Sequence, residues 1–219
     1  MPQQAATELL RQRVASGVPD EPHQQVVLLR HGETEWSRDL KHTGRTDVPL
    51  TDRGRHQAEL AGHRLAHWNF GIVLCSPLRR AAETCRIAGC GKEAQIDPDL
   101  REWDYGDYDG LTTSQIRQQQ PGWLLWRDGA RGGEDAADVG VRADRVIARI
   151  RELQGHVAVF SHGHFLRVLA ARWLTYSPQE GARFALDTAC ISVLGYEHAV
   201  AAILLWNDAG HLGGDRRHD

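Results

Sequence analysis

Residues 28–37 read LLRHGETEWS, and the fold of the chain can be worked out from this stretch outward. It begins inside a run of four branched apolar residues, Val26–Leu29, and then changes abruptly to Arg30, His31 and Gly32. Four such residues in a row are typical of a strand that is buried on both faces, as in a parallel sheet. The sequence therefore predicts a central strand that places an arginine and a histidine side by side at its carboxyl end.

The same pattern of apolar runs recurs along the chain. It predicts further strands at Ile72–Cys75, Ala94–Ile96, Val157–Phe160, Ile191–Gly195 and Ala201–Leu205. Helical spacing and capping residues predict the helices between them: one after a Thr51 cap, one opening at Ser76-Pro77, short ones within 113–133, one over 134–153 and one ending near Leu174. Strands that alternate with helices indicate an α/β fold, a three-layer α/β/α sandwich around a mostly parallel central sheet.

Composition narrows the class of protein. The 219 residues carry a net charge of −3, which argues against nucleic acid or an anionic membrane as a partner. No apolar run approaches the roughly 18 residues of a membrane span. The four cysteines lack pairing or zinc-type spacing, so reduced thiols and a cytoplasmic location are expected. We expect an N-terminal arm (1–24), one domain (25–212) and a flexible tail (213–219).

Three of the predicted strands end in residues suited to anions. Arg30 and His31 follow the first strand, Arg80 lies in the helix after the second, and His162 and Gly163 follow the strand at 157–160. In an open α/β sheet, ligands collect at the carboxyl ends of the strands, beside helix N-termini. Arginine grips phosphate oxygens two at a time. This combination predicts a pocket for a phosphoryl group.

Such a pocket also needs a nucleophile and a proton donor. A neutral imidazole is a good nucleophile, and it forms a phosphoramidate that is easily hydrolysed. Flanking arginines would stabilise the charge of the transferring phosphoryl group. An alcohol leaving group then needs a proton, and Glu102, in the acidic and aromatic loop 100–110, is the candidate donor.

Four ordered motifs resemble those of the histidine phosphatase superfamily, also called the phosphoglycerate mutase-like fold. RHGETEWS (30–37) resembles the family signature RHGxTxWN, and SPLRRAAET (76–84) resembles SxLxRAxxT. LREWDYGDYDG (100–110) resembles LxExxxGxxEG, and SHGH (161–164) carries the second histidine. HTGRTDVPLT, GGED and WNDAGHL also match family patterns, so the resemblance covers roughly residues 26–212.

The resemblance implies a role for each motif residue. His31 would be the phosphorylated nucleophile, and Glu102 the proton donor. Arg30, Arg80 and His162 would hold the phosphoryl group, with no metal and no cofactor. Substrate contacts would come from Gly32, Ser37, Thr43, Gly44, Tyr105 and Gly163.

Two positions depart from the family pattern. Ser37 stands where the first motif usually has asparagine, and Asp109 stands where a glutamate usually precedes Gly110. Both lie where the family touches its substrate or shapes its pocket. Four basic residues of the following loop could hold a second phosphate or could be solvated: Arg38, Lys41, His42 and Arg45.

Three activities are consistent with these motifs. The protein could be a phosphatase for small phosphomonoesters, a phosphoglycerate mutase, or a non-enzymatic phosphate-binding module. The interval from Glu102 to His162 is short and lacks the paired-arginine insertion of the mutases, and no catalytic residue is missing. We therefore predict a phosphatase, nearest in appearance to the sugar-bisphosphatase and broad acid phosphatase branches. Its partner would be a small phosphomonoester, and a homodimer is left open.

Other chemistries find less support. No cysteine has an arginine six positions on, and the segment 97–99 lacks the context of an aspartyl-phosphate enzyme. Glu59, His63 and His67 share a helix face and could bind a metal, but a solvated surface stripe is the simpler interpretation. The aromatic residues of the acidic loop either line the pocket or pack beneath the loop: Trp103, Tyr105 and Tyr108.

The proposed roles also predict a pH profile. His31 must be neutral to attack, whereas Glu102 and His162 would work protonated. These requirements predict a bell-shaped dependence of kcat/KM with its maximum on the order of pH 5–6.

Overall fold

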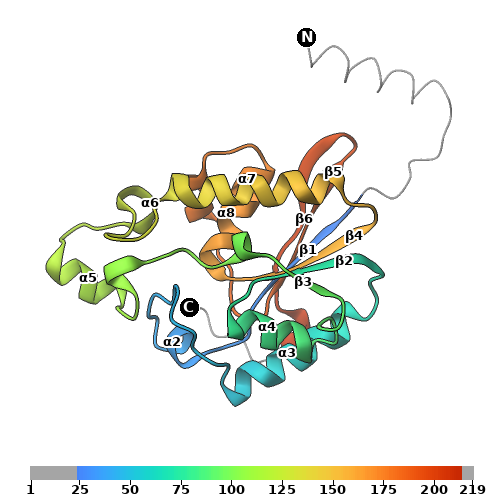
Figure 1. The fold of residues 1–219 in the computed structure, drawn as a ribbon, viewed down its shortest axis with the longest axis horizontal. Coiled ribbons are helices and arrows are strands. Elements are labelled where there is room, and N and C mark those ends of the chain that lie inside the picture. The colour runs from blue at the N-terminus through green and yellow to red at the C-terminus, as the bar shows by residue number, and fades with distance from the viewer. Residues whose placement is uncertain (1–23, 214–219) are drawn as a thin grey trace, which may run out of the picture.

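The centre of the molecule is a six-stranded sheet, described by a computed structural model that covers residues 24–213 (Figure 1). The predicted arm, 1–24, and tail, 213–219, lie outside these residues except at Gln24 and Gly213. All six predicted strands are confirmed: β1 (Val26–Arg30), β2 (Phe70–Cys75), β3 (Ala94–Ile96), β4 (His156–Ser161), β5 (Ile191–Glu197) and β6 (Val200–Asp208).

The order of the strands brings the first and fourth motifs together. The order is β3-β2-β4-β1-β5-β6, in which β3, β2, β4 and β1 run parallel and β5 and β6 are antiparallel additions at one side. In the β1–β4 ladder, Arg30 lies opposite Ser161. The residues that follow these two strands, His31 and His162, therefore leave the sheet side by side.

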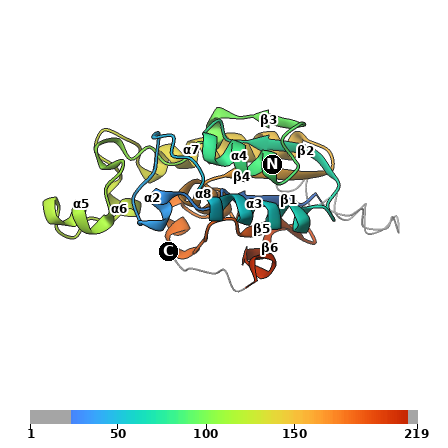
Figure 2. The same cartoon turned by 90° about the horizontal axis from the view of Figure 1, so that it is seen from below.

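Helices cover both faces of this sheet, which confirms the three-layer α/β/α prediction. On one face, α3 (Asp52–Leu65) and α4 (Arg79–Ile87) pack on the alternate β1 residues Val27 and Leu29. On the other, α7 (Ala136–Glu152) and α8 (Gly163–Trp173) pack on Val26 and Leu28. Figure 1 shows the two helix layers above and below the strands, and Figure 2 shows α3 and α4 in front of the sheet.

Short elements make up the connections. They are α2 (Glu35–Arg38), η1 (Pro98–Leu100), η2 (Gly106–Tyr108), α5 (Thr113–Gln119), α6 (Leu125–Asp128), η3 (Pro178–Arg183) and η4 (Gly210–Leu212). The helix α2 was predicted as part of a loop. Its four residues are held by a capping box in which the Thr34 side chain accepts from Ser37 N and the Ser37 side chain accepts from Thr34 N.

Two predicted helix starts were wrong by two residues. The helix α4 begins at Arg79, after Leu78, because the Ser76 hydroxyl contacts His162 in place of capping this helix. The helix α7 begins at Ala136, where the Asp135 side chain accepts hydrogen bonds from two backbone N–H groups. The shift of α4 leaves the Ser76 side chain in contact with His162 of the site. The predicted Thr51 cap of α3 is confirmed, since its side chain accepts from Gly54 N.

Two further features concern the helices and the cysteines. Within residues 24–213, no helix combines the length and the apolar character needed to cross a bilayer. None of the four cysteines, all of which lie in this range, forms a disulfide bond.

Candidate active site

The carboxyl ends of β1 and β4 form the centre of the site. The backbone N–H of His31 donates to the carbonyl of Ser161 at 3.0 Å, which ties the two strand ends together. The rings of His31 and His162 lie 5.2 Å apart, centre to centre. Arg30 ends β1, and Arg80, from the first turn of α4, contacts His162. The structure thus brings the four residues of the predicted phosphoryl pocket together.

The tautomer of His31 is set by its neighbour. Its Nδ1 lies 2.8 Å from the carbonyl oxygen of Gly32, which can only accept a hydrogen bond, so Nδ1 carries the proton. The lone pair is then on Nε2. Burial lowers the pKa of His31 well below its usual value of 6.5, and the charges of Arg80 and Arg30 lower it further. His31 is therefore a neutral imidazole with an available ring nitrogen.

Gly32 keeps this turn close to the start of α3. A Cβ on Gly32 would lie 2.2 Å from the carbonyl oxygen of Gly54, and a Cβ on Gly54 would lie 2.1 Å from that of Glu33. Contacts this short with backbone atoms leave no room for a side chain on either residue. The N–H of Gly32 donates to Thr84 Oγ1, which joins the same turn to α4.

Arg80 and His162 lie beneath the site, both with 0% of their surface exposed. Arg80 Nε donates to His162 Nδ1 at 3.2 Å, so His162 carries its proton on Nε2, which lies 2.7 Å from Ser76 Oγ. Burial lowers the pKa of His162 well below 6.5, and the charge of Arg80 adds to this effect. The prediction that His162 works protonated is wrong for this structure, because a second positive charge here would be both desolvated and repelled.

A carboxylate organises the loop that holds Arg80. The guanidinium of Arg80 donates to the carbonyls of Thr43, Gly44 and Thr46. Asp109, in turn, accepts from the N–H groups of Gly44 at 2.7 Å and Thr46 at 3.1 Å, and from the Thr46 hydroxyl at 2.8 Å. The aspartate that departs from the family pattern therefore acts on the loop around Arg80.

Glu102 binds the N-terminus of α8. Its Oε1 accepts from the N–H groups of Trp103 at 2.8 Å and Phe165 at 2.9 Å, and its Oε2 accepts from His164 N at 3.1 Å. The N–H groups of His164 and Phe165 belong to the unpaired donors of a helix start. Oε1 has both acceptor positions filled, whereas Oε2 keeps one.

A cavity of about 540 Å³ opens above these groups. Its lining includes Arg30, His31 and Glu102, but Arg80 and His162 are not part of it. Four predicted substrate contacts also line it: Ser37, Thr43, Tyr105 and Gly163. The other two do not, because Gly32 is packed on Gly54 and Gly44 is bonded to Asp109.

Among the lining residues that the sequence reasoning missed are His164, Thr113 and Arg167. His164 Nδ1 lies 2.7 Å from the Tyr105 hydroxyl, and Thr113 Oγ1 lies 3.2 Å from His42 Nε2. Arg167 stacks on a tryptophan ring, and burial followed by the charge of Arg30 lowers its pKa to about 10. His164 is the last residue of the SHGH motif, and Arg167 follows it one turn along α8, so helical spacing from His164 could have found Arg167.

Some of the basic and aromatic residues considered in the sequence analysis line the cavity, and others do not. Of the four basic loop residues, Lys41 and His42 line the cavity, whereas Arg38 pairs with Asp39 and Arg45 pairs with Asp104. Burial lowers the pKa of His42 to about 4. Of the three aromatic residues of the acidic loop, only Tyr105 lines the cavity, and Trp103 and Tyr108 are buried under the loop.

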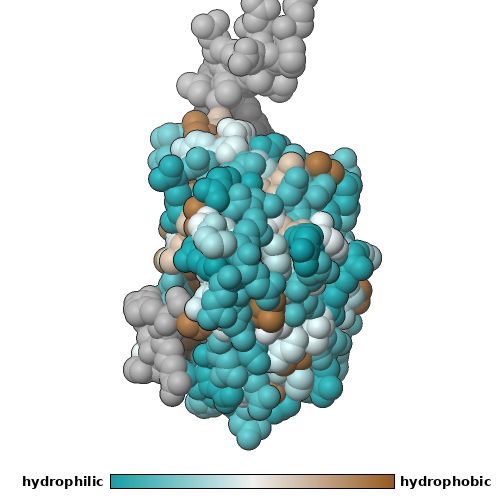
Figure 3. Space-filling model, turned by 90° about the vertical axis from the view of Figure 1, so that its left-hand side faces the viewer, coloured by the Kyte–Doolittle hydropathy of each residue, from teal (hydrophilic) through white to brown (hydrophobic). Residues whose placement is uncertain are grey.

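The outer surface agrees with the simpler interpretations. Glu59 and His63 are exposed on α3, and His67 is exposed just beyond its end. Within residues 24–213 no three His, Cys, Asp or Glu side chains gather as a metal site. Figure 3 shows that the side carrying α2 and α5 is mainly hydrophilic, with hydrophobic residues scattered over it.

Comparison with known proteins agrees with this geometry. The model of the histidine phosphatase superfamily (branch 1) matches residues 26–209. An acid phosphatase of Mycobacterium tuberculosis is 46% identical over 191 residues, which cover 85% of this chain and 94% of the relative. Sedoheptulose 1,7-bisphosphatase of Saccharomyces cerevisiae is 35% identical over 186 residues, covering 70% of this chain and 69% of the relative.

Solved structures are similar throughout. The structure of an open reading frame product from Mycobacterium tuberculosis superimposes with a TM-score of 0.82 at 45% identity, covering 86% of this chain and 99% of that one. A mycobacterial glucosyl-3-phosphoglycerate phosphatase in complex with VO3 gives 0.78 at 28% identity, covering 85% of this chain and 100% of that one. The chain therefore belongs to the histidine phosphatase superfamily.

Proposed function

We propose that the protein is a phosphomonoesterase that hydrolyses small phosphorylated metabolites through a phosphohistidine on His31, without a metal. The observation that carries this proposal is the tautomer of His31. With Nδ1–H donated to the Gly32 carbonyl, Nε2 holds its lone pair in the cavity beside Arg30. A neutral ring nitrogen next to a guanidinium matches the needs of attack on a phosphoryl group.

In the first step, Nε2 of His31 attacks phosphorus, and the bond from phosphorus to the alcohol oxygen breaks. Arg30 binds phosphoryl oxygens, and Arg80 provides buried positive charge beneath them. His162 donates to them once its Nε2–H, which contacts Ser76 Oγ in this structure, exchanges that partner for a phosphoryl oxygen. The departing alcohol takes a proton from Oε2 of Glu102, the carboxyl oxygen with an open position.

In the second step, water attacks phosphorus from the side that the alcohol has left. Glu102 takes a proton from this water, the bond between phosphorus and Nε2 breaks, and phosphate leaves. Since Glu102 first gives and then regains the proton, the enzyme returns to its starting state.

Acid-labile phosphate on the protein tests this mechanism. When turnover of a ³²P-labelled phosphomonoester is quenched with base, label should remain on the wild type and be absent from His31→Ala. His31→Ala should also lose activity by a factor of about 10³ or more. A labelled residue other than His31, or near-normal turnover by His31→Ala, contradicts the proposal.

Transfer to water is favoured over return of the phosphoryl group. The interval from Glu102 to His162 folds into short helices and α7 and contains no paired-arginine insertion. We therefore expect phosphate release without a bisphosphate primer. Interconversion of 2- and 3-phosphoglycerate that depends on such a primer and exceeds hydrolysis would identify a mutase instead.

The cavity supports substrates with a second anionic group. Lys41 and Arg167 line it in addition to Arg30, and no ion pair of Lys41 or Arg167 with a carboxylate is found among residues 24–213. The names of the relatives include a sugar bisphosphatase and a phosphatase of glucosyl-3-phosphoglycerate. Lys41→Met should raise KM for a sugar bisphosphate by about tenfold and leave KM for glycerol phosphate nearly unchanged. Equal changes for both substrates would remove Lys41 from substrate binding.

We also propose that the protein works in the cytoplasm. The thiols of Cys75, Cys85, Cys90 and Cys190, none of them in a disulfide, support a reducing compartment. Fractionation of the cells that produce the protein tests the location. A homodimer stays a prediction that sedimentation equilibrium decides.

A further inference from the structure

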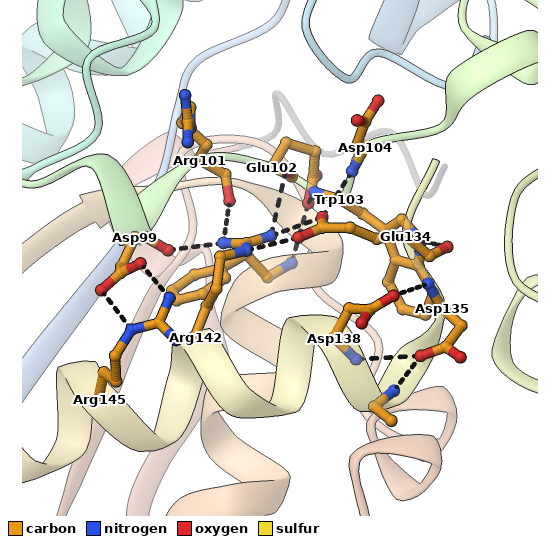
Figure 4. A network of polar contacts seen from close by, with 12 residues as sticks. Asp99, Arg101, Glu102, Trp103, Asp104, Glu134, Asp135, Asp138, Arg142 and Arg145 are labelled. Carbon is orange, nitrogen blue, oxygen red and sulfur yellow. Dashed lines mark hydrogen bonds and ion pairs between the residues drawn. The ribbon is translucent and has the colours of Figure 1, made fainter. Parts of the chain in front are cut away.

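A network of polar contacts surrounds the backbone of Glu102 (Figure 4), and neither of its two central residues lines the cavity. At its centre is Arg142 of α7, a residue that is only 8% exposed. Its partner is Glu134, which accepts from Arg142 Nε at 2.7 Å and from a terminal NH2 nitrogen of Arg142 at 2.8 Å. The reaction assigned above uses neither residue, although both are ionised side chains withdrawn from water at some cost.

The remaining N–H groups of Arg142 donate to carbonyls in one short stretch of backbone. They donate to the carbonyls of Asp99 at 2.6 Å, Arg101 at 3.1 Å and Glu102 at 3.4 Å. All five N–H groups of the guanidinium therefore have an acceptor. A lysine, with one charged nitrogen, could not reach the same acceptors from one position.

Glu134 holds the other side of the same stretch. Its Oε2 accepts from Asp104 N at 2.9 Å, its backbone N–H donates to the carbonyl of Asp104, and its carbonyl accepts from Trp103 Nε1 at 2.8 Å. Arg142 and Glu134 together therefore bind the backbone on both sides of Glu102, from Asp99 to Asp104.

A second connection runs through the partner of the Glu102 carboxyl group. The guanidinium of Arg142 lies over the ring of Phe165, 5.1 Å from its centre. The N–H of Phe165 is one of the donors to Glu102 Oε1. The same guanidinium thus fixes the main chain of Glu102 and supports the helix start that binds its side chain.

We infer that Arg142 and Glu134 are positioning residues for the proton donor Glu102, acting through the backbone of residues 99–104. This inference rests on the proposed function, in which Glu102 protonates the leaving alcohol. A displacement of a proton donor by about 1 Å costs much of its effect. Loss of the Arg142–Glu134 pair should therefore impair the same step as loss of Glu102 itself.

The test compares two leaving groups. p-Nitrophenol departs with little help from an acid, whereas glycerol needs a proton. Arg142→Gln should lower kcat/KM for glycerol phosphate by about tenfold more than for p-nitrophenyl phosphate. The control is Arg145→Gln, one turn further along α7, because Arg145 pairs with Asp99 at the surface with half of its side chain exposed. It should leave both values nearly unchanged.

A double variant separates positioning from general damage. If Arg142 acts through Glu102, Arg142→Gln should add little loss on glycerol phosphate in a Glu102→Gln background. Should Arg142→Gln fail to fold, Glu134→Gln, which keeps the shape and one acceptor oxygen, is compared on the same two substrates. Equal losses for both leaving groups in the variant that folds would overturn the positioning role.

Glu102→Gln, measured alongside, distinguishes the two proposals. If Glu102→Gln shows the leaving-group difference and the Arg142 and Glu134 variants do not, the positioning inference fails while the proposed function stands. If Glu102→Gln itself shows no difference, the acid role of Glu102 fails, and the positioning inference falls with it.

Discussion

Asp109 stands at a position where the chain departs from the family motif, and its carboxylate binds the loop around Arg80. It holds the N–H groups of Gly44 and Thr46, whose carbonyls accept from Arg80. Asp109→Ala should release this loop and lower kcat/KM for phosphomonoesters by about tenfold, chiefly through KM. Steady-state kinetics measure the effect.

The matched control for Asp109 lies two residues earlier. Asp107 pairs with Arg131, and both side chains are more than half exposed. Asp107→Ala should change kcat/KM by less than about twofold, since exposed pairs contribute little. If both substitutions have the same effect, the contacts of Asp109 with the loop do not matter for catalysis.

The protonation of His31 sets the acid side of the activity profile. Burial, Arg80 and Arg30 lower the pKa of His31 well below 6.5, so its nucleophilic neutral form persists at acid pH. The acid limb of kcat/KM should therefore fall below pH 6.5. An acid limb above that value, in a plot of kcat/KM against pH, contradicts a neutral, buried nucleophile.

At the scale of elements, Glu102 links the acid loop to α8. In Glu102→Ala the backbone N–H groups of His164 and Phe165 lose their acceptor, which should lower the free energy of unfolding by about 1–3 kcal/mol. Glu102→Gln keeps an acceptor oxygen and should lose less. Urea denaturation of the two variants measures the difference, and identical unfolding midpoints would show that the carboxyl group does not stabilise the helix start.

A comparison of the helices and strands with the sequence predictions shows which features could be predicted from the sequence. Apolar runs predicted every strand because buried strands differ sharply from their surroundings, and the order of motifs along them predicted the grouping of Arg30, His31, Arg80 and His162. The predicted start of α4 was wrong because a serine before a proline can either cap a helix or bind another side chain. Only the fold shows that Ser76 lies 2.7 Å from His162. Nothing in the sequence indicated that Arg142 is buried next to the backbone of Glu102, since an arginine on a helix is usually solvated.

At the scale of the whole molecule, four histidines at the site, two buried and two half-buried, make stability depend on pH. Burial is the largest cause that lowers the pKa in each of them: His31, His42, His162 and His164. In the unfolded chain their pKa is about 6.5. Below pH 6.5 the histidines of the unfolded chain bind protons, whereas the same histidines in the folded protein stay neutral. The free energy of unfolding is therefore highest above pH 6.5 and decreases as the pH falls toward the pKa values of the folded protein.

The size of this effect can be measured by urea unfolding. Each histidine contributes a slope of up to about 1.4 kcal/mol per pH unit within its window. For His42 the window extends from about 6.5 down to about 4. His42→Asn should remove one histidine's share of the slope, while an unfolding free energy that stays constant from pH 7.5 to 5 would show that these residues protonate freely in the folded protein.

The place of β1 in the sheet has a consequence for synthesis on the ribosome. The strand β1 ends at residue 30, whereas its neighbours β4 and β5 end only at residues 161 and 197. A nascent chain therefore carries Arg30 without its partner Ser161 until β4 has been translated, and β1 lacks its second neighbour until β5 follows. Pairings so distant in sequence close slowly, so the catalytic centre forms well after Arg30 and His31 have been translated. A nascent chain that lacks β4 and β5 is therefore expected to be inactive.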